Sequence, residues 1–355
     1  MTKRKHFFLN LKEKFNWEYW PIYMFYIPLL PLYVYYSLRS GSFTYFVATN
    51  PAIKNGGDAT ESKFETLKLL PKNLIPKSLF IPSNQNVNVV IENLKKENLH
   101  FPLIIKPDIG YRGLLVKKLN VQKDLECFLK KYSQINFIVQ EFVSYKKECG
   151  ILYVRYPDEE KGKITSITLK KYLDVKGDGA STVADLISHD DQAQRYKSIY
   201  QEQIIQYLSY QPKKGETFLL NEIGNHCKGA AFLNGNHLIS KNLTNTFDKI
   251  SQDVKGVFFG RYDVKYNDFR SLELGKDFRI IELNGVIAEP THIYDAPNSS
   301  YLYALKSIAK HWQYVYQISK INHKKGVKYK NFWSVLNGLL ALRPYNKMIQ
   351  KLSEN

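Results

Sequence analysis

The sequence is poor in several features that mark common classes of protein. It has only three cysteines, Cys127, Cys149 and Cys227, which are far apart and odd in number. This pattern fits neither a disulfide framework nor a zinc site, and it indicates a reducing compartment. No Gly-Lys-Ser/Thr motif opens a predicted helix, which excludes a P-loop. Internal repeats and low-complexity runs are also missing.

Acidic residues are scarce at both ends of the chain. The 355 residues include 51 Lys and Arg against 33 Asp and Glu, a formal net charge of +18. Residues 1–16 contribute +4 and residues 301–355 contribute +9, so the long middle part is nearly balanced. A hydrophobic content of 44% provides for a sizeable core. The basic ends indicate contact with an anionic surface, either a membrane or nucleic acid.

Charged residues are missing altogether from residues 19–38. This stretch is long enough to span a bilayer, but Pro21, Pro28 and Pro31 disfavour one straight helix. Its Trp and Tyr residues favour the headgroup region. We therefore expect a basic arm and a membrane-associating segment over residues 1–40, as a hairpin or an interfacial anchor. The alternative is a buried pair of aromatic helices packed on the body.

Strands that occur in pairs, mixed with helices, predict an α+β body rather than an alternating Rossmann sheet. The polar stretches 190–212 and 301–355 are predicted to be helical, and "GAAFLNGNHLIS" is predicted to be a hairpin that turns at Asn234–Gly235. The remaining expected strands are "HFPLIIKP", "NFIVQEFV", "ECGILYVRYP", "KITSITLKKYLDV", "GRYDVKY" and "FRIIELN".

The last two of these strands carry polar side chains at alternate positions. Glu282 and Asn284 share one face of their strand, while Arg261 and Asp263 share one face of the other. If the two strands pair as a hairpin, these side chains gather at one place. Two carboxylates and an amide suit Mg²⁺, which keeps several waters and is completed by substrate phosphates.

These two segments resemble the ATP-grasp superfamily, particularly the D-alanine–D-alanine ligase branch of carboxylate–amine ligases. "GRYDV" and "RIIELN" match the two motif strands of that family. The resemblance implies an ATP-grasp fold, in which two α+β lobes clasp ATP. It also implies that Asp263 and Glu282 hold one Mg²⁺, and that Glu282 and Asn284 hold a second, with Mn²⁺ as a substitute. Arg261 would stabilise charge on the reacting groups.

The resemblance extends to residues that would hold the phosphates. The family places a lysine at the end of a strand, before a glycine-containing loop, and Lys106 occupies that place in "KPDIGYRG". Gly110 and Gly113 would let backbone N–H groups approach the phosphates. A second lysine at the start of an earlier helix corresponds to Lys63.

The remaining ATP-binding residues implied by the resemblance lie further along the chain. Glu141 and Val143 would offer backbone groups to the adenine, and Glu148, seven residues after Glu141, would accept the ribose hydroxyls. A lysine on the following strands would reach the terminal phosphate, and Lys170 and Lys171 are the candidates. Lys106, Lys170 and Arg261 are thus the expected catalytic cations.

The chain departs from the ligase pattern after the Glu-x-Asn motif. The family continues with a Ser/Thr-Pro-Gly loop, whereas this sequence reads "GVIAEPTHIYD". Glu289 and His292 in this loop are candidates for binding an amine-bearing acceptor. His226 and Lys228, in "GNHCKG", are candidates for binding the carboxylate donor or a phosphate. All four are equally compatible with ordinary polar loop residues.

The expected organisation follows from these assignments. We expect the basic arm and hydrophobic segment at 1–40, a shortened N-terminal region at 41–100, a central ATP-grasp lobe at 101–147, a C-terminal lobe at 148–300 and a basic helical tail at 301–355.

The expected function is that of an ATP- and Mg²⁺-dependent ligase on the cytoplasmic side of a membrane. It would activate a small or lipid-linked carboxylate as an acyl phosphate and join it to an amine. The alternatives are an ATP-grasp kinase that phosphorylates a hydroxyl and a non-catalytic membrane adaptor that keeps the fold. Nucleic-acid binding is disfavoured, since Trp312, Tyr314 and Tyr316 in the basic tail are not accompanied by a recognised nucleic-acid motif.

Overall fold

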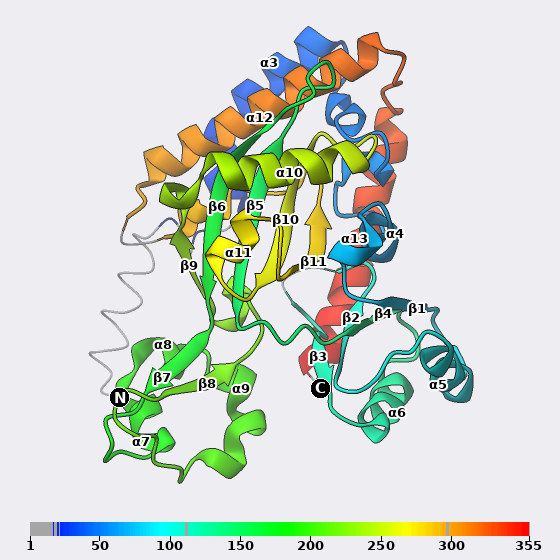
Figure 1. Cartoon of the computed structure of the whole chain (residues 1–355). Helices are drawn as coiled ribbons and strands as arrows, with labels where there is room; N and C mark the ends of the chain where they lie inside the picture. The colour runs from blue at the N-terminus through cyan, green and yellow to red at the C-terminus, as the bar shows by residue number, and fades with distance from the viewer. Residues whose placement is uncertain (1–16, 18–19, 21, 111–112, 296–297, 355) are drawn as a thin grey trace.

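The computed structural model describes Trp17, Trp20 and residues 22–110, 113–295 and 298–354. The expected basic arm, residues 1–16, lies outside the described residues. In the described part of the chain, helices pack on antiparallel sheets, and the sequence-based prediction of an α+β body is confirmed (Figure 1).

The central lobe is built on a four-stranded sheet with the strand order β1-β4-β2-β3. Its elements are β1 (Ser78–Ile81), α5 (Val87–Lys96), β2 (Leu103–Pro107), β3 (Lys117–Leu119), α6 (Gln122–Lys131) and β4 (Phe137–Glu141). In α6, Leu125, Phe128 and Leu129 lie on one face because their spacing matches the helical period, and all three are buried. β1 pairs along β4 from Ser78 to Ile81. The central lobe therefore includes residues before 101, where the sequence-based boundary was placed.

The C-terminal lobe is built on a five-stranded sheet with the order β11-β10-β5-β6-β9. Its strands are β5 (Lys147–Val154), β6 (Lys163–Lys171), β9 (Ala231–Asn234), β10 (Phe259–Tyr266) and β11 (Phe278–Asn284). Helix α10 (Lys241–Asp253) covers one face of this sheet and α12 (Tyr301–Lys324) the other (Figure 1). Because both faces are covered, β5 is buried along its whole length after Lys147.

The hairpin expected at Asn234–Gly235 is wrong. β9 ends at Asn234, pairs with β6, and is followed by a 3-10 turn, η8 (Asn236–Leu238). The amide of Gly235 donates to the carbonyl of Ile167 on β6, and the side chain of Asn236 accepts from the amide of Ile167. These two bonds hold the turn against β6, so the chain does not double back as a strand.

A smaller lobe follows the end of β6. It consists of a two-stranded sheet with short helices: β7 (Leu173–Lys176), α7 (Val183–His189), α8 (Asp191–Arg195), α9 (Lys197–Ile204), η6 (Ile205–Tyr207) and β8 (Thr217–Asn221). It has its own core, which includes Leu173, Val183 and Tyr200. The helices confirm the prediction for residues 190–212 as far as Tyr207, and residues 208–212 are not helical.

The hydrophobic N-terminal segment is broken into α2 (Ile22–Tyr26), η2 (Ile27–Leu29) and α3 (Leu30–Ser40). Pro28 and Pro31 lie in the first turns of η2 and α3, where a missing N–H costs least. α3 runs alongside α12 (Figure 1), and Tyr36 stacks on Tyr316 with ring centroids 4.5 Å apart. One face of the segment therefore packs on the body, as the buried-helix alternative expected. Among the described residues, no helix is both long and apolar enough to cross a membrane.

The basic C-terminal region is helical and largely packed. In α12, Tyr314 is buried, Trp312 stacks on Tyr26 and Tyr316 on Tyr36, so these three aromatics take part in the protein's own packing. Helix α13 (Phe332–Glu354) then descends from the α3 end of the molecule to the central lobe (Figure 1). The remaining short elements are η3 (Tyr45–Ala48), η4 (Lys54–Gly56), α4 (Lys63–Lys68), η5 (Lys72–Leu74), η7 (His226–Lys228), α11 (Phe269–Glu273) and η9 (Thr291–Tyr294).

Candidate active site

The two motif strands pair as the sequence predicts. β10 and β11 are antiparallel neighbours, with Asp263 opposite Glu282 and Arg261 opposite Asn284. A connection containing the short helix α11 joins them. Because side chains alternate along each strand, the four polar side chains lie on the same face of the sheet.

A glycine on the next strand makes room for this polar row. Gly150 of β5 lies opposite Asp263. A Cβ atom at Gly150 would lie 3.1 Å from Cδ of Arg261 and 3.2 Å from Oδ1 of Asp263. With that space free, Nε of Arg261 donates to Oδ1 of Asp263 at 3.0 Å. The ion pair keeps the guanidinium close against the sheet.

Two lysines from other elements reach Glu282. Ser62 caps α4 by accepting from the amide of Glu65, and the lysine that follows, Lys63, donates from Nζ to Oε1 of Glu282 at 2.5 Å. Nζ of Lys106, near the end of β2, donates to the carbonyl of Ile281 at 3.0 Å. Burial lowers the pKa of Lys106 to about 8. Burial also acts to raise the pKa of Glu282, but Lys63 and Lys106 outweigh it and hold that pKa at about 2.

A second buried cluster continues the row across the sheet. Nζ of Lys170 donates to Oε1 of Glu148 at 2.6 Å and lies 3.4 Å from Oδ2 of Asp263. Burial opposes the charge on Lys170, yet these two carboxylates raise its pKa. The hydroxyl of Tyr172 donates to the other oxygen of Glu148. Both oxygens of Glu148 therefore have partners within the protein, and its contact with a ribose stays a prediction.

These clusters open into one cavity of about 380 Å³ between the lobes. Its volume lies within the roughly 300–1,000 Å³ that is usual for ligand pockets. Twelve of the residues expected at the site from the sequence line it: Lys63, Lys106, Gly110, Gly113, Glu141, Val143, Glu148, Lys170, Arg261, Asp263, Glu282 and Asn284. Their individual roles stay predictions, but the expected gathering of cations and carboxylates in one place is present.

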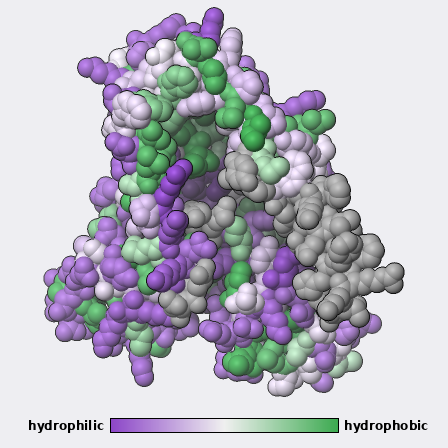
Figure 2. Space-filling model, turned by 180° about the vertical axis from the view of Figure 1, so that it is seen from behind, coloured by the Kyte–Doolittle hydropathy of each residue, from purple (hydrophilic) through white to green (hydrophobic). Residues whose placement is uncertain are grey.

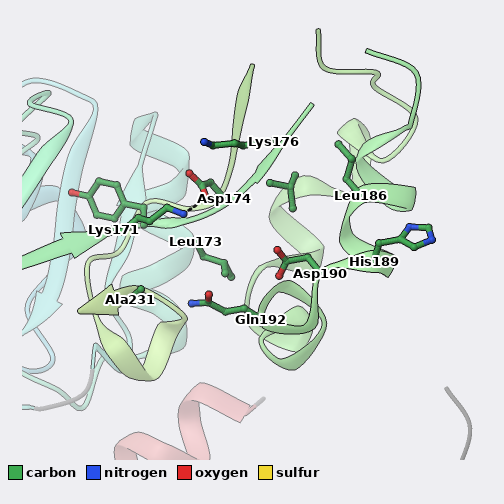
Figure 3. Close-up of a pocket in the computed structure, with 11 residues that line it drawn as sticks. Lys171, Leu173, Asp174, Lys176, Leu186, His189, Asp190, Gln192 and Ala231 are labelled. Atoms are coloured by element: carbon green, nitrogen blue, oxygen red, sulfur yellow. Dashed lines mark ion pairs between the residues drawn. The ribbon is translucent and has the colours of Figure 1, made fainter. Parts of the chain in front are cut away.

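Lys171 is not brought to this cavity. It follows Lys170 on β6, so its side chain points to the opposite side of the strand, where it forms an ion pair with Asp174 at 3.4 Å. There it lines a separate cavity of about 400 Å³ in the small lobe, together with Lys176 and His189 (Figure 3). Of the two candidate lysines, Lys170 lines the cavity between the lobes and Lys171 does not.

The acceptor-loop candidates are engaged elsewhere. The carboxylate of Glu289 accepts from the hydroxyls of Tyr26 and Tyr294. His292 is buried, with its ring nitrogens bonded to Ser166 and Tyr303. Neither residue lines the cavity. Both side chains instead fix the loop that follows β11.

The other two substrate candidates, His226 and Lys228, also fall outside the cavity lining. The ring of His226 packs near Phe232 and Tyr294, with centroids 5.4 and 5.9 Å away. The neighbouring Asn225 lines the cavity instead. A short loop places consecutive side chains in different directions, which the sequence motif could not resolve.

One cavity residue that sequence reasoning missed is Glu61. It lines the cavity, and within the described residues its buried Oε2 has no hydrogen-bond partner. Burial raises the pKa of its carboxyl group. The loop that carries it is held against the loop after β11, since the amide of Val286 donates to the carbonyl of Gly56 and that of Ile287 to Gly57. The available signal was its position two residues before Lys63.

The chemistry of the donor set fits a hard cation. Within the described residues, no group of three or more His, Cys, Asp and Glu is close enough to bind a metal. Asp263 and Glu282, with the amide of Asn284, offer the oxygen ligands that Mg²⁺ prefers when phosphates and waters complete its shell. The buried Nδ2 of Asn284 also has no partner within the described residues. Glu282 is paired with Lys63, which bound phosphates would attract away, and Asp263 is paired with Arg261.

Comparison with known proteins agrees with this geometry. A family model described as the RimK-like ATP-grasp domain matches residues 60–160. The expected resemblance to the ATP-grasp superfamily is therefore confirmed, and this match over residues 60–160 carries it. No curated protein matches the chain.

Several solved structures resemble the chain at low identity. They include a D-alanine–D-alanine ligase from Bacillus anthracis (13% identity, 75% of this chain and 69% of that chain, TM-score 0.41). The VanG D-Ala:D-Ser ligase from Enterococcus faecalis aligns with 14% identity over 73% of this chain and 61% of its own, with a TM-score of 0.40. A bifunctional glutathione synthetase from Pasteurella multocida aligns with 16% identity over 71% of this chain, with a TM-score of 0.38, and only 36% of its own length is covered.

Proposed function

We propose that the protein is an ATP-dependent ligase that activates a carboxylate as an acyl phosphate and joins it to an amine. The observation that carries the proposal is the convergence of Lys63, Lys106, Lys170 and Arg261 with Asp263 and Glu282 on one cavity. Phosphoryl transfer needs positioning and charge neutralisation more than covalent chemistry. The domain match to the ATP-grasp superfamily points to the same chemistry.

The cations divide the work by their position. Lys106, near the end of β2, and the adjacent Gly110 and Gly113 would hold the inner phosphates. Lys63 would leave Glu282 for a phosphate oxygen, which frees that carboxylate for Mg²⁺. The metal would be held by Asp263, Glu282 and Asn284, and it would neutralise charge on the phosphates. Arg261, held by Asp263, would face the charge that develops on the reacting carboxylate.

The amine would bind at the end of the cavity that Glu61 lines. Oε2 of Glu61, which has no hydrogen-bond partner among the described residues, would accept a hydrogen bond from the amine. Because burial raises the pKa of this carboxylate, it could also accept the proton that the amine loses. The chemistry is two-step. The substrate carboxylate attacks the γ-phosphorus with loss of ADP, and the amine then displaces phosphate from the acyl phosphate.

The reaction would take place at the cytoplasmic side of a membrane, where ATP is available. The exposed hydrophobic residues of α3 and the basic C-terminal helices support this location. A lipid-linked or amphipathic substrate would then reach the cavity without leaving the bilayer surface.

The test is a screen for ADP release by the full-length chain with ATP and Mg²⁺, against amino acids, dipeptides and lipid-linked acids, with mass spectrometry of the product. A ligase releases ADP and free phosphate in equal amounts and yields a product that joins acid and amine. ADP with a phosphorylated product and no free phosphate would identify a kinase. Absence of turnover with every acid, despite ATP binding, would favour a non-catalytic adaptor.

A further inference from the structure

One face of the N-terminal helices is apolar and exposed in the part of the chain that the structure describes. On α3, Leu30, Val34 and Leu38 are spaced four residues apart and exposed, on the side away from Tyr36, which packs on α12. Leu38 exposes 71% of its surface. Met24 and Ile27 extend the same stripe toward the start of the chain. Figure 2, which views the molecule from behind, shows hydrophobic residues in a band across its upper part.

This stripe continues onto the first turn of α13. The hydroxyl of Tyr33 on α3 donates to the carbonyl of Phe43, and the ring of Phe43 lies 6.2 Å from that of Phe332. Trp333 follows, with 66% of its surface exposed. The apolar rim is hereafter the set Met24, Ile27, Leu30, Val34, Leu38, Phe43, Phe332 and Trp333.

The charge around the apolar rim is positive, which favours an anionic binding partner. The sequence has no acidic residue between positions 19 and 57 or between 296 and 353. Exposed basic residues flank the rim instead, including Arg39 and Lys328. A second copy of the chain would bring the same positive charge against this face. An anionic lipid surface matches both the hydrophobic and the basic components.

Helix α13 connects the apolar rim to the cavity. It is 23 residues long, which corresponds to roughly 34 Å. Just past its midpoint the hydroxyl of Tyr345 donates to the carbonyl of Ile109 at 3.0 Å, directly before Gly110 of the cavity wall. Ile349 is 1% exposed and packs in the central-lobe core that contains Leu115. The same helix thus begins at the apolar rim and, past its midpoint, contacts the glycine-containing segment of the cavity wall.

We infer that an anionic lipid surface binds the apolar rim and, through α13, steadies the phosphate-binding segment, so that lipid raises nucleotide affinity and turnover. The expected rise in turnover rests on the proposed function. Lipid binding and the effect of lipid on the phosphate-binding segment do not depend on it. α13 is suited to this coupling because a helix is stiffer than a flexible linker, and the helix continues through Pro344, the residue before Tyr345.

Lipid binding is tested by flotation of the full-length protein with vesicles of phosphatidylcholine alone or with 30% phosphatidylserine. We expect binding to the anionic vesicles that weakens in 0.5 M salt and falls about tenfold or more in Leu38→Ser/Trp333→Ser. The matched control is Ile205→Ser, which replaces a residue 70% exposed on the small lobe, and it should bind as the wild type does. Equal binding by all three proteins would overturn the assignment of the apolar rim.

Coupling is tested with Tyr345→Phe, which removes the donor to Ile109 and leaves the rim intact. Anionic vesicles should slow hydrogen exchange at the amides of residues 113–119 and tighten MgATP binding severalfold in the wild type. Tyr345→Phe should bind vesicles normally but lose most of both effects. If anionic vesicles change neither the hydrogen exchange of residues 113–119 nor the MgATP affinity of the wild type, the coupling is overturned. A failed ligase screen with these vesicle effects preserved would instead overturn only the proposed function.

Discussion

Asp263 lies directly opposite Glu282 in the antiparallel pairing of β10 with β11. Each carboxylate is paired with a cation from another direction, Arg261 on its own strand and Lys63 from the start of α4. Without such partners, two carboxylates at directly opposite positions on adjacent strands would repel each other. The arrangement therefore holds positive charge next to the proposed metal-binding pair, where a nucleotide would draw Lys63 away from Glu282 with its phosphates and bring Mg²⁺ to the carboxylates.

Glu282→Gln should abolish ATP turnover while the fold persists. The amide keeps the shape of the side chain but removes a negative ligand, so a loss on the order of 10²-fold or more is expected in ADP release. Glu65→Gln is the matched control, because Glu65 is exposed on α4 and pairs only with Lys68 among the described ion pairs. Wild-type turnover in Glu282→Gln, with the control unchanged, would refute the metal assignment.

MgATP binding should weaken above pH 8 because of Lys106. Burial lowers the pKa of Lys106 to about 8, so the ammonium is charged below that pH and neutral above it. If only the charged form holds the phosphates, the dissociation constant rises up to about tenfold per pH unit above 8. Titration calorimetry between pH 7 and 9.5 would measure it.

Lys106→Arg provides the control for this pH dependence. An arginine stays protonated throughout the range, so its affinity should be flat where the wild-type affinity falls. The same fall in both proteins would assign the effect to another group, such as Lys265, whose pKa burial also lowers.

Mild acid should destabilise the fold through two buried histidines. Burial lowers the pKa of His292 and of His311 to about 4. Between pH 6.5 and 4 the unfolded chain therefore binds protons that the folded chain does not, and stability falls as the pH falls through this window. The loss is up to about 2 kcal/mol per histidine at pH 5.

Urea unfolding at pH 7 and pH 5 would measure this loss. The carboxylate of Glu282 stays ionised over this range. Burial acts to raise its pKa, but Lys63 and Lys106 hold that pKa at about 2. His292→Gln/His311→Gln should therefore lose less stability between the two pH values than the wild type. An identical loss in both proteins would contradict the assignment to these side chains.

Gly285→Ala should damage both stability and the site. A Cβ atom at this position would lie 2.3 Å from the carbonyl oxygen of Gly56, which belongs to a backbone that cannot rotate away. We expect a loss of about 1–3 kcal/mol in the free energy of unfolding. A rise in the KM of the amine substrate should accompany it, because the displaced loop carries Glu61.

Gly338→Ala is the matched control for this substitution. Gly338 lies inside α13, and a Cβ atom there would meet its nearest neighbour, Thr60, only at 3.8 Å. Since alanine favours a helix interior by about 0.5–1 kcal/mol over glycine, stability should stay level or rise. Equal effects of the two substitutions would show that the close approach of residues 56 and 285 is unimportant.

Part of the cavity between the lobes was predictable because its strand residues obey local rules. Alternation along "GRYDV" and "RIIELN" places Arg261, Asp263, Glu282 and Asn284 on one face once the strands pair, and the structure pairs them in that register. The resemblance to the ATP-grasp superfamily and the capping residues of the predicted helix located Lys63, which the structure places directly after its cap at Ser62. They did not distinguish Lys170 from Lys171. These adjacent lysines lie on opposite faces of the strand, and only the tertiary structure decides which face lines the cavity.

The substrate end of the cavity was less accessible to sequence reasoning. Glu289 and His292 form hydrogen bonds with side chains far away in the chain, such as those of Tyr26 and Ser166, and these bonds hold the loop after β11. The ring of His226 packs near Phe232 and Tyr294, and Lys228 lies outside the cavity lining. Glu61 was overlooked because its only sequence signal is its closeness to Lys63.

The amino-acid sequence by itself determined the periodic parts of this protein: the strand pair with its acidic and basic row, the lysine before the glycine-containing turn, and the breaks that proline places in the N-terminal segment. Only the tertiary structure decided which loop residues face the cavity, which side of α3 remains uncovered, and where the basic C-terminal helix docks. Periodicity is a property of neighbouring residues, whereas these outcomes depend on contacts between segments hundreds of residues apart, such as Tyr345 with Ile109.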